Sequence, residues 1–323
     1  MNSPLRSLLF VPGDSERKQA KALTSAADAV ILDLEDSVAA AQRPAARARI
    51  RQLLQSRIGT GADSRRARHG EGRGPHEPEL WVRLNAPSSG QFLEDLAAVF
   101  PGAPAGLVLP KISGAAEIVQ VDRDLAALET RDSRSVGSTR LIVICTETPQ
   151  AVLSLPSYAQ ALASEPAAAA RIAALTWGSE DLSAALGASG KVDADGAPTF
   201  TFQLARSLCL LAAAAIGVQA IDGVCVDFRS TERLQREAGD ARRDGFTGKL
   251  AIHPDQIATI NSAFSPSEPE LARARRIVAA FAASPEAGAL SLDGEMIDRP
   301  HLLQARRILG LSPRGAEQAV KLR

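Results

Sequence analysis

The stretch AVILDLEDSV, residues 29–38, joins a short apolar run to a group of acids. Residues 29–32 are all apolar, and Asp33, Glu35 and Asp36 follow at the end of the run. A continuous apolar run of this length is typical of a parallel strand that is covered on both faces. Burying carboxylates without partners is costly, so we expect cationic groups close to the end of this strand.

Seven further segments repeat this arrangement of an apolar run with a polar end. The eight runs are LLFVPG (8–13), AVILDLED (29–36), LWVRLNA (80–86), AGLVLPK (105–111), RLIVICTET (140–148), ALTWGSED (174–181), AIDGVCVDF (220–228) and KLAIHP (249–254). Segments rich in Ala, Leu and Arg with a helical period follow these runs. Strands that alternate with helices indicate βαβ units, and eight such units predict a (β/α)8 TIM barrel.

Polar residues stand at the C-terminal end of each run. They are Asp33, Glu35, Asp36, Arg83, Asn85, Lys111, Glu147, Glu180, Asp181, Asp227 and His253. In a TIM barrel these ends converge on one rim, which is where the active sites of this fold lie. The acids of the second run are therefore expected to share a rim with Arg83, Lys111 and, in one interpretation, a metal ion.

Composition and charge restrict the class of protein. The 323 residues are 45% hydrophobic, which is enough for a large core, and Lys plus Arg equals Asp plus Glu at 37 each. A zero formal charge gives no global basic field, so nucleic acid and anionic membranes are not expected as partners. The apolar run in the N-terminal segment has too few residues for the core of a signal peptide. No run approaches the roughly 20 apolar residues of a membrane span.

The three cysteines, Cys145, Cys209 and Cys225, each lie in apolar sequence. An odd number without CxxC spacing argues against a disulfide framework and against a zinc site. A reducing cytoplasm is the expected location.

Two parts of the chain are predicted, a barrel over residues 1–264 and a C-terminal extension over 265–323. Residues 57–79, rich in Gly, Arg and Pro, predict a flexible insertion without a role in chemistry. The extension holds two helical segments around PEAGALSLDGEMIDRP, residues 285–300. Gly294 is a candidate hinge of a helical lid that carries acids, Asp298 among them. On spacing alone, the segment would be a capped turn with Asp298 near the start of the last helix.

Glu147 and Asp181 are the candidate metal ligands because they end successive predicted strands. Two carboxylates at this spacing could hold Mg²⁺, with waters and a substrate carboxylate completing the octahedron. Salt bridges to Arg83 or Lys111 would give the same pattern. Spacing alone leaves both interpretations open.

Arg83 is a candidate to bind a carboxylate or to stabilise an enolate oxygen, because its guanidinium donates in a fixed fork. A rim salt bridge with Glu35 or Asp36 is the alternative. Arg6, just before the first predicted strand, is a second arginine of this type, and the Gly-containing turn after that strand could bind phosphate or carboxylate or serve only as a helix cap.

Two other residues are candidates for a base or a nucleophile. His253, beside a proline at a strand end, is interpreted as a structural group rather than a base. Lys111 could form a Schiff base, but nearby acids would raise its pKa and weaken it as a nucleophile. The metal route is therefore preferred to the imine route.

The sequence resembles the citrate lyase β subunit-like group of the HpcH/HpaI aldolase and citrate lyase superfamily. The resemblance rests on RSLLFVPGDSERK (6–18), DAVILDLEDSV (28–38), WVRLNA (81–86), LVLPKI (107–112), LTWGSEDLSAALG (175–187), RSLCLLAAAAIGVQAIDGVCVDF (206–228), GFTGKLAIHPDQI (245–257) and DGEMIDRPHLLQARRIL (293–309). It covers nearly the whole chain apart from the 57–79 insertion. It implies a TIM barrel, Mg²⁺, a homotrimer or homohexamer, and reversible cleavage of a 3-hydroxyacyl thioester carried on coenzyme A or on an acyl carrier protein.

The resemblance also implies roles for single residues. The matching positions are Glu147 and Asp181 as metal ligands, Asp36 as a partner of a metal-bound water, Arg83 as the catalytic arginine that binds substrate and enolate, Asp298 as a catalytic acid reaching a neighbouring subunit's site, and Arg6, Lys111 and Glu147 as substrate contacts. One departure is CTETPQAV (145–152), where many relatives have an IETARG-like run. Glu147 is kept, but the loop behind it differs, so the substrate shape is not fixed by the resemblance.

The implied activity is a Mg²⁺-dependent carbon–carbon lyase that cleaves a citryl-, malyl- or citramalyl-type thioester into a keto acid and an acyl thioester through an enolate. Three alternatives are a malyl-CoA-type thioesterase, an aldolase that uses free pyruvate, and a paralogue that binds a thioester or keto acid without turnover. The complete set of Arg83, Glu147, Asp181 and Asp298 argues against a simple binder.

Overall fold

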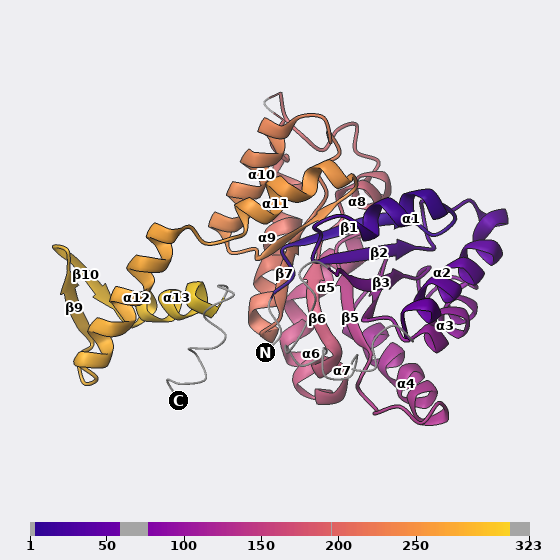
Figure 1. The fold of residues 1–323 in the computed structure, drawn as a ribbon, viewed down its shortest axis with the longest axis horizontal. Helices are drawn as coiled ribbons and strands as arrows, with labels where there is room; N and C mark the ends of the chain where they lie inside the picture. Colours follow the sequence, from indigo (N-terminus) through magenta and orange to yellow (C-terminus); the bar gives the residue numbers. More distant parts are fainter. Residues whose placement is uncertain (1–3, 59–76, 195, 311–323) are drawn as a thin grey trace.

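The computed structural model describes residues 4–58, 77–194 and 196–310, and it contains a closed eight-stranded parallel barrel (Figure 1). The strands are β1 (Ser7–Pro12), β2 (Ala29–Asp33), β3 (Glu79–Arg83), β4 (Gly106–Leu109), β5 (Arg140–Ile144), β6 (Ile172–Thr176), β7 (Gln219–Asp222) and β8 (Gly248–Ala251). Each strand pairs with the next in the sequence, and β8 closes on β1. The predicted (β/α)8 TIM barrel is confirmed.

Helices surround this barrel on its outer side (Figure 1). They are α1 (Glu16–Leu23), α2 (Arg43–Ile58), α3 (Phe92–Val99), α4 (Ala115–Arg131), α5 (Pro149–Ser154), α6 (Tyr158–Ala163), α7 (Pro166–Arg171), α8 (Ser179–Leu186), α9 (Phe200–Ile216), α10 (Thr231–Asp244) and α11 (Ile257–Ala263). In the part of the chain that the structure describes, no helix is long and apolar enough to cross a membrane.

Two apolar layers explain why the strands read as continuous apolar runs. In β2, Ala29 and Ile31 belong to the cluster inside the barrel, whereas Val30 and Leu32 pack in the layer between strands and helices. Successive side chains of a strand point to opposite faces, so both faces here are covered. By the same alternation Asp33 follows Ile31 on the inner side, at the C-terminal rim of the barrel.

A C-terminal arm leaves the barrel after α11 and projects away from it (Figure 1). It consists of α12 (Glu268–Ala283), a hairpin of β9 (Ala289–Leu292) and β10 (Glu295–Asp298), and α13 (Arg299–Gly310). The arm has its own small apolar cluster, made by Ala274, Ile277, Phe281, Ile297, Leu302 and Ala305. This cluster joins its two helices to the hairpin and is separate from the clusters of the barrel.

The hairpin differs from the expected hinge or capped turn. Asp293 and Gly294 take positive φ values of 55° and 80°, the backbone that a two-residue Asp-Gly hairpin turn requires. Asp298 ends β10 directly before α13, which agrees with its expected position near a helix start. Most of the predicted insertion at 57–79 lies outside the described residues; its last residue, Glu79, begins β3.

Candidate active site

Asp33 is held at the rim by Arg83, at the ends of the neighbouring strands β2 and β3. Arg83 donates from Nε and Nη2 to the two carboxylate oxygens of Asp33, at 2.6 and 2.7 Å. The backbone N–H groups of Glu35 and Ser37 donate to the same carboxylate. Burial alone would raise the pKa of Asp33, but the hydrogen bonds and charge of Arg83 outweigh it and lower that pKa. Asp33, the buried acid at the end of the second apolar run, therefore has a cationic partner, as the sequence predicted.

Glu35 and Asp36 lie between two cations. Arg83 Nη1 is 2.9 Å from Glu35 Oε2, and Lys111 Nζ is 2.7 Å from Glu35 Oε1. The exposed Asp36 is 3.6 Å from Arg83 and 3.4 Å from Lys111. Burial raises the pKa of Glu35 to about 7, even though both cations act to lower it. These contacts are the rim salt bridges that the sequence left open as the alternative role of Arg83.

Lys111 contacts both candidate metal ligands. Its backbone N–H donates to Glu147 Oε2 at 2.5 Å, and its Nζ is 3.2 Å from Asp181 Oδ1. Lys111 has a φ of 55°, a left-handed conformation that is uncommon for a residue other than glycine and that clusters at functional sites. Partial burial lowers its pKa, but Glu35, Asp181 and Asp36 together raise it. The side chain thus stays an ammonium, which weighs against a Schiff-base role.

Glu147 is a buried carboxylate that the chain itself leaves short of positive charge. It follows β5, and burial raises its pKa to about 8, with further increases from the charges of Glu35 and Asp181. The segment after β6 packs tightly against it: a Cβ on Gly178 would lie 3.0 Å from Glu147 Cγ. Asp181 stands in the first turn of α8. The ends of β5 and β6 therefore bring the two candidate ligands to one place.

The chemistry of this donor set fits a hard divalent cation. Lys111 contacts all four acids, Glu35, Asp36, Glu147 and Asp181, and Arg83, which also binds Asp33, contacts Glu35 and Asp36. Within the described ranges, no group of three or more His, Cys, Asp or Glu side chains could hold a metal ion by itself. Glu147 and Asp181 would therefore supply two oxygens, and water or substrate oxygens would supply the others, as Mg²⁺ prefers.

Arg6 is not brought to this rim. It precedes β1 and so lies at the opposite, N-terminal end of the barrel. Its guanidinium donates to both carboxylate oxygens of Asp28, at 2.9 and 2.8 Å, and to Ser265 Oγ at 2.9 Å. Within one chain these contacts give Arg6 a structural role, and its expected substrate contact stays a prediction.

Asp298 is also remote from the rim of its own barrel, because it lies on the projecting arm (Figure 1). Its Oδ1 is 2.6 Å from His301 Nδ1 in the first turn of α13. Its expected place in a neighbouring subunit's site stays a prediction.

His253 behaves as the structural group that the sequence suggested. Its Nδ1 accepts a hydrogen bond from the backbone of Asp255 at 3.3 Å, and its ring stacks on Phe228. Sequence reasoning was wrong at the seventh strand, where it selected Asp227. The strand ends earlier, at the buried Asp222, while Asp227 is exposed. The position of Asp222, directly after the apolar pair Ala220 and Ile221, could have identified it as the end of this strand.

Comparison with known proteins agrees with this geometry. The family model of the HpcH/HpaI aldolase/citrate lyase family matches residues 6–254. The chain is 37% identical over 302 residues to the citrate lyase subunit beta-like protein of Mycobacterium tuberculosis, covering 93% of each chain. It is 33% identical over 315 residues to the mitochondrial citramalyl-CoA lyase of Rattus norvegicus, covering 96% of this chain and 86% of the relative.

Two further similarities concern activity and structure. A (3S)-malyl-CoA thioesterase of Cereibacter sphaeroides is 34% identical over 308 residues, covering 95% of this chain and 94% of the relative. A crystal structure of the protein CitE from M. tuberculosis with magnesium, acetoacetate and coenzyme A superposes with a TM-score of 0.69 at 35% identity, covering 95% of this chain and 97% of that one. With its barrel, its rim of acids and these matches, the chain belongs to the HpcH/HpaI aldolase/citrate lyase family.

Proposed function

We propose that this protein is a Mg²⁺-dependent carbon–carbon lyase acting on a 3-hydroxyacyl thioester of the citramalyl, malyl or citryl type. The observation that carries the proposal is the meeting of Glu147 and Asp181 beside Arg83, with Glu147 buried and its pKa raised to about 8. The relatives named as citramalyl-CoA lyase and citrate lyase subunit beta-like protein support this reaction class. The CitE complex with magnesium and coenzyme A supports the cofactor and the thioester carrier.

In this proposal Glu147 and Asp181 hold Mg²⁺, and Asp36 accepts a hydrogen bond from a water beside it. When bound, the ion supplies a Lewis acid that lowers the pKa of the substrate hydroxyl. A base takes the hydroxyl proton, the carbon–carbon bond breaks, and its electron pair moves onto the thioester carbonyl. Arg83, oriented by Asp33, stabilises the enolate oxygen. Asp298 of an adjacent subunit returns a proton to the enolate carbon, which gives the acyl thioester.

Turnover of malyl-, citramalyl- and citryl-CoA, with and without Mg²⁺, tests the proposal when keto acid and free thiol are followed separately. Keto acid without thiol, only when Mg²⁺ is present, is the expected result and would identify the substrate. Release of thiol would instead support the thioesterase reaction, which the Cereibacter relative makes the second candidate. No product from these thioesters or from their acyl-carrier-protein forms would overturn the proposal.

The proposal also includes the assembly and the location of the protein. The arm supports a homotrimer or homohexamer, and the cysteines support a cytoplasmic location. The arm, which carries Asp298 at the end of β10, projects away from its own barrel (Figure 1). The three described cysteines are buried and free, as suits a reducing compartment. Mixing inactive Asp298→Asn protein with inactive Glu147→Gln protein should restore part of the activity after subunit exchange, because mixed assemblies contain intact sites. A mixture that stays inactive, although mass spectrometry shows exchanged subunits, would exclude sharing of sites between subunits.

Replacing Lys111 by methionine is expected to tighten Mg²⁺ binding. The ammonium stands 3.2 Å from Asp181 and 2.7 Å from Glu35, so it competes for the same negative charge. Removing a unit charge at this range predicts a Kd about tenfold lower in calorimetric titration. Lys111→Arg, which keeps the charge, is the control and should leave Kd nearly unchanged. Weaker binding by Lys111→Met would show that the lysine supports the ion rather than competing with it.

A further inference from the structure

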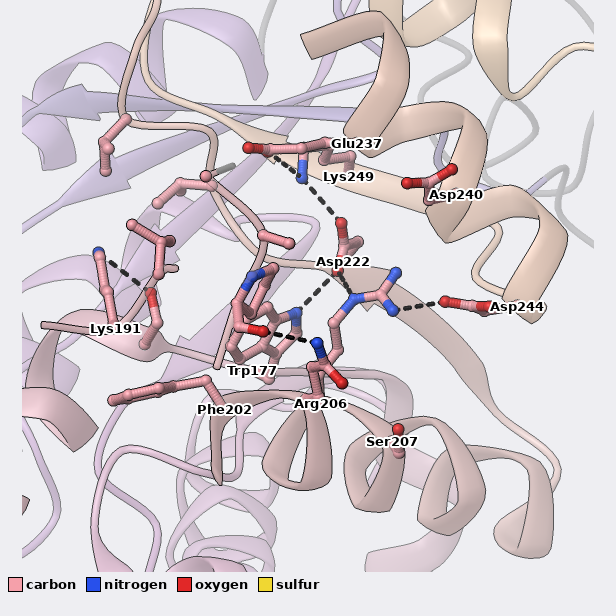
Figure 2. A pocket seen from close by; sticks show the side chains of 18 of the residues that line it. Trp177, Lys191, Phe202, Arg206, Ser207, Asp222, Glu237, Asp240, Asp244 and Lys249 are labelled. Atoms are coloured by element: carbon pink, nitrogen blue, oxygen red, sulfur yellow. Dashed lines mark hydrogen bonds and ion pairs between the residues drawn. The ribbon is translucent and has the colours of Figure 1, made fainter. Parts of the chain in front are cut away.

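Trp177, which precedes the segment carrying Asp181, is hydrogen-bonded to the buried Asp222. Its indole Nε1 donates to Asp222 Oδ1 at 2.8 Å (Figure 2), and the contact joins the residue after β6 to the last residue of the neighbouring strand β7. The backbone of Gly223 lies close to the same ring: an added Cβ would be 3.2 Å from Trp177 Nε1. The ring is therefore confined on the side that faces β7.

Asp222 is itself fixed by charges from two other elements. Arg206 of α9 donates from Nε to Oδ1 at 2.8 Å, and Lys249 of β8 donates from Nζ to Oδ2 at 2.7 Å (Figure 2). Burial would raise the pKa of Asp222, but Lys249 and Arg206 outweigh it and lower that pKa. Asp222 thus stays an ionised, immobile acceptor for the indole N–H.

Trp177 is largely buried, but part of it borders a pocket. A cavity of about 480 Å³ lies between residues 191–192 and 196–198, α9 and α10, and Trp177 lines it together with Phe202 and Arg206 (Figure 2). Where the ring borders this space, it has fewer packing neighbours to hold it in place. The hydrogen bond to Asp222 adds a fixed point to the packing of the ring.

Trp177 directly precedes the segment that carries Asp181 and packs against Glu147. Gly178 follows directly; its N–H donates to Thr146 Oγ1 at 3.0 Å, and it lies against Glu147. Helix α8 then begins at Ser179 and presents Asp181 in its first turn. A shift of Trp177 would move this short segment as a unit.

We propose that Trp177 is a positioning residue which, through its hydrogen bond to Asp222, sets the distance between Asp181 and Glu147. The inference rests on the proposed Mg²⁺ site. Partners outside the coordination sphere that orient metal ligands typically change metal affinity by about 10- to 100-fold when they are removed.

Two substitutions of similar size separate the hydrogen bond from the volume of the ring. Trp177→Phe removes the N–H, and we expect the Mg²⁺ Kd from calorimetric titration to rise about tenfold. Trp177→His keeps only a five-membered ring, but it can place Nε2–H where the indole Nε1–H stood. Its Kd should return to within about threefold of the wild-type value, although both variants lose stability through the vacated volume.

Glu237→Gln is the matched control, because Glu237 lines the same cavity and pairs with Lys249 and Arg233 without contacting Trp177. Its Kd should stay within about twofold of the wild-type value. Equal Kd values for wild type and Trp177→Phe, or for Trp177→Phe and Trp177→His, would overturn the positioning role. Absence of Mg²⁺ binding by the wild-type protein would instead overturn the metal site on which the inference rests.

Discussion

Glu147→Gln protein is expected to lose turnover by at least about 10³-fold, because the substitution removes one of the two charged oxygens proposed to hold Mg²⁺. The same change should raise the melting temperature of the metal-free protein at pH 8. A neutral amide at this buried position avoids the cost of a carboxylate whose pKa is raised to about 8. Steady-state kinetics with the substrate found in the thioester panel and thermal unfolding without Mg²⁺ measure the two effects on one variant.

Glu180→Gln is the control for Glu147→Gln. Glu180 is also an acid in the first turn of α8, but it pairs with Lys191 away from the acid cluster. Its kcat should remain within about twofold of the wild-type value, since neither the charge nor the shape of the site changes. Full activity of Glu147→Gln would remove Glu147 from the metal site, whatever its effect on stability.

Arg83→Met is expected to lower stability by about 3–5 kcal/mol as well as to abolish activity, because it leaves the buried Asp33 carboxylate without its main partner. The guanidinium also lies over the Phe10 ring at 4.9 Å, so some packing is lost with the charge. Denaturant unfolding with a linear extrapolation gives the free energy of unfolding, and kcat/KM gives the catalytic loss.

The double variant Asp33→Asn/Arg83→Met separates these two effects. The side-chain amide that replaces the carboxylate is neutral, and its oxygen can still accept from the backbone of Glu35 or Ser37, so a substantial part of the lost stability should return. Activity should not return, because no guanidinium faces the substrate. Recovery of activity in the double variant would show that Arg83 acts only by neutralising Asp33.

The barrel could be predicted because its strands, such as β2, are covered on both faces and are therefore rich in apolar residues. The rim followed from strand ends, which is why Arg83, Lys111, Glu147 and Asp181 were selected together. Pairing within the rim was not predictable. No pattern in one dimension shows that Arg83 binds Asp33 with two hydrogen bonds while Lys111 contacts both candidate ligands.

Sequence reasoning failed where the local signal was weak or the direction of a chain segment mattered. The strands β9 and β10 have four residues each and are largely exposed, so they lack the apolar run that identified the others. Arg6 was selected because its motif resembles a substrate contact, but it precedes β1 and so lies at the face of its own barrel opposite to the strand ends. The anchor of Trp177 on Asp222 joins residues 45 positions apart and leaves no local trace.

The contact between Arg6 and Ser265 has a mechanical consequence for the arm. Ser265 lies between α11 and α12, where the arm leaves the barrel, and Arg6 ties this point to Asp28. Helix α12 has 16 residues and is about 24 Å long. Because of this length, a rotation of roughly 5° at its first residue displaces its last residue by about 2 Å. Misplacement of a reacting group by about 1 Å can cost about 100-fold in rate. Asp298 is proposed to act in another subunit. The contact between Arg6 and Ser265, at the N-terminal face of its own barrel, therefore helps to position it.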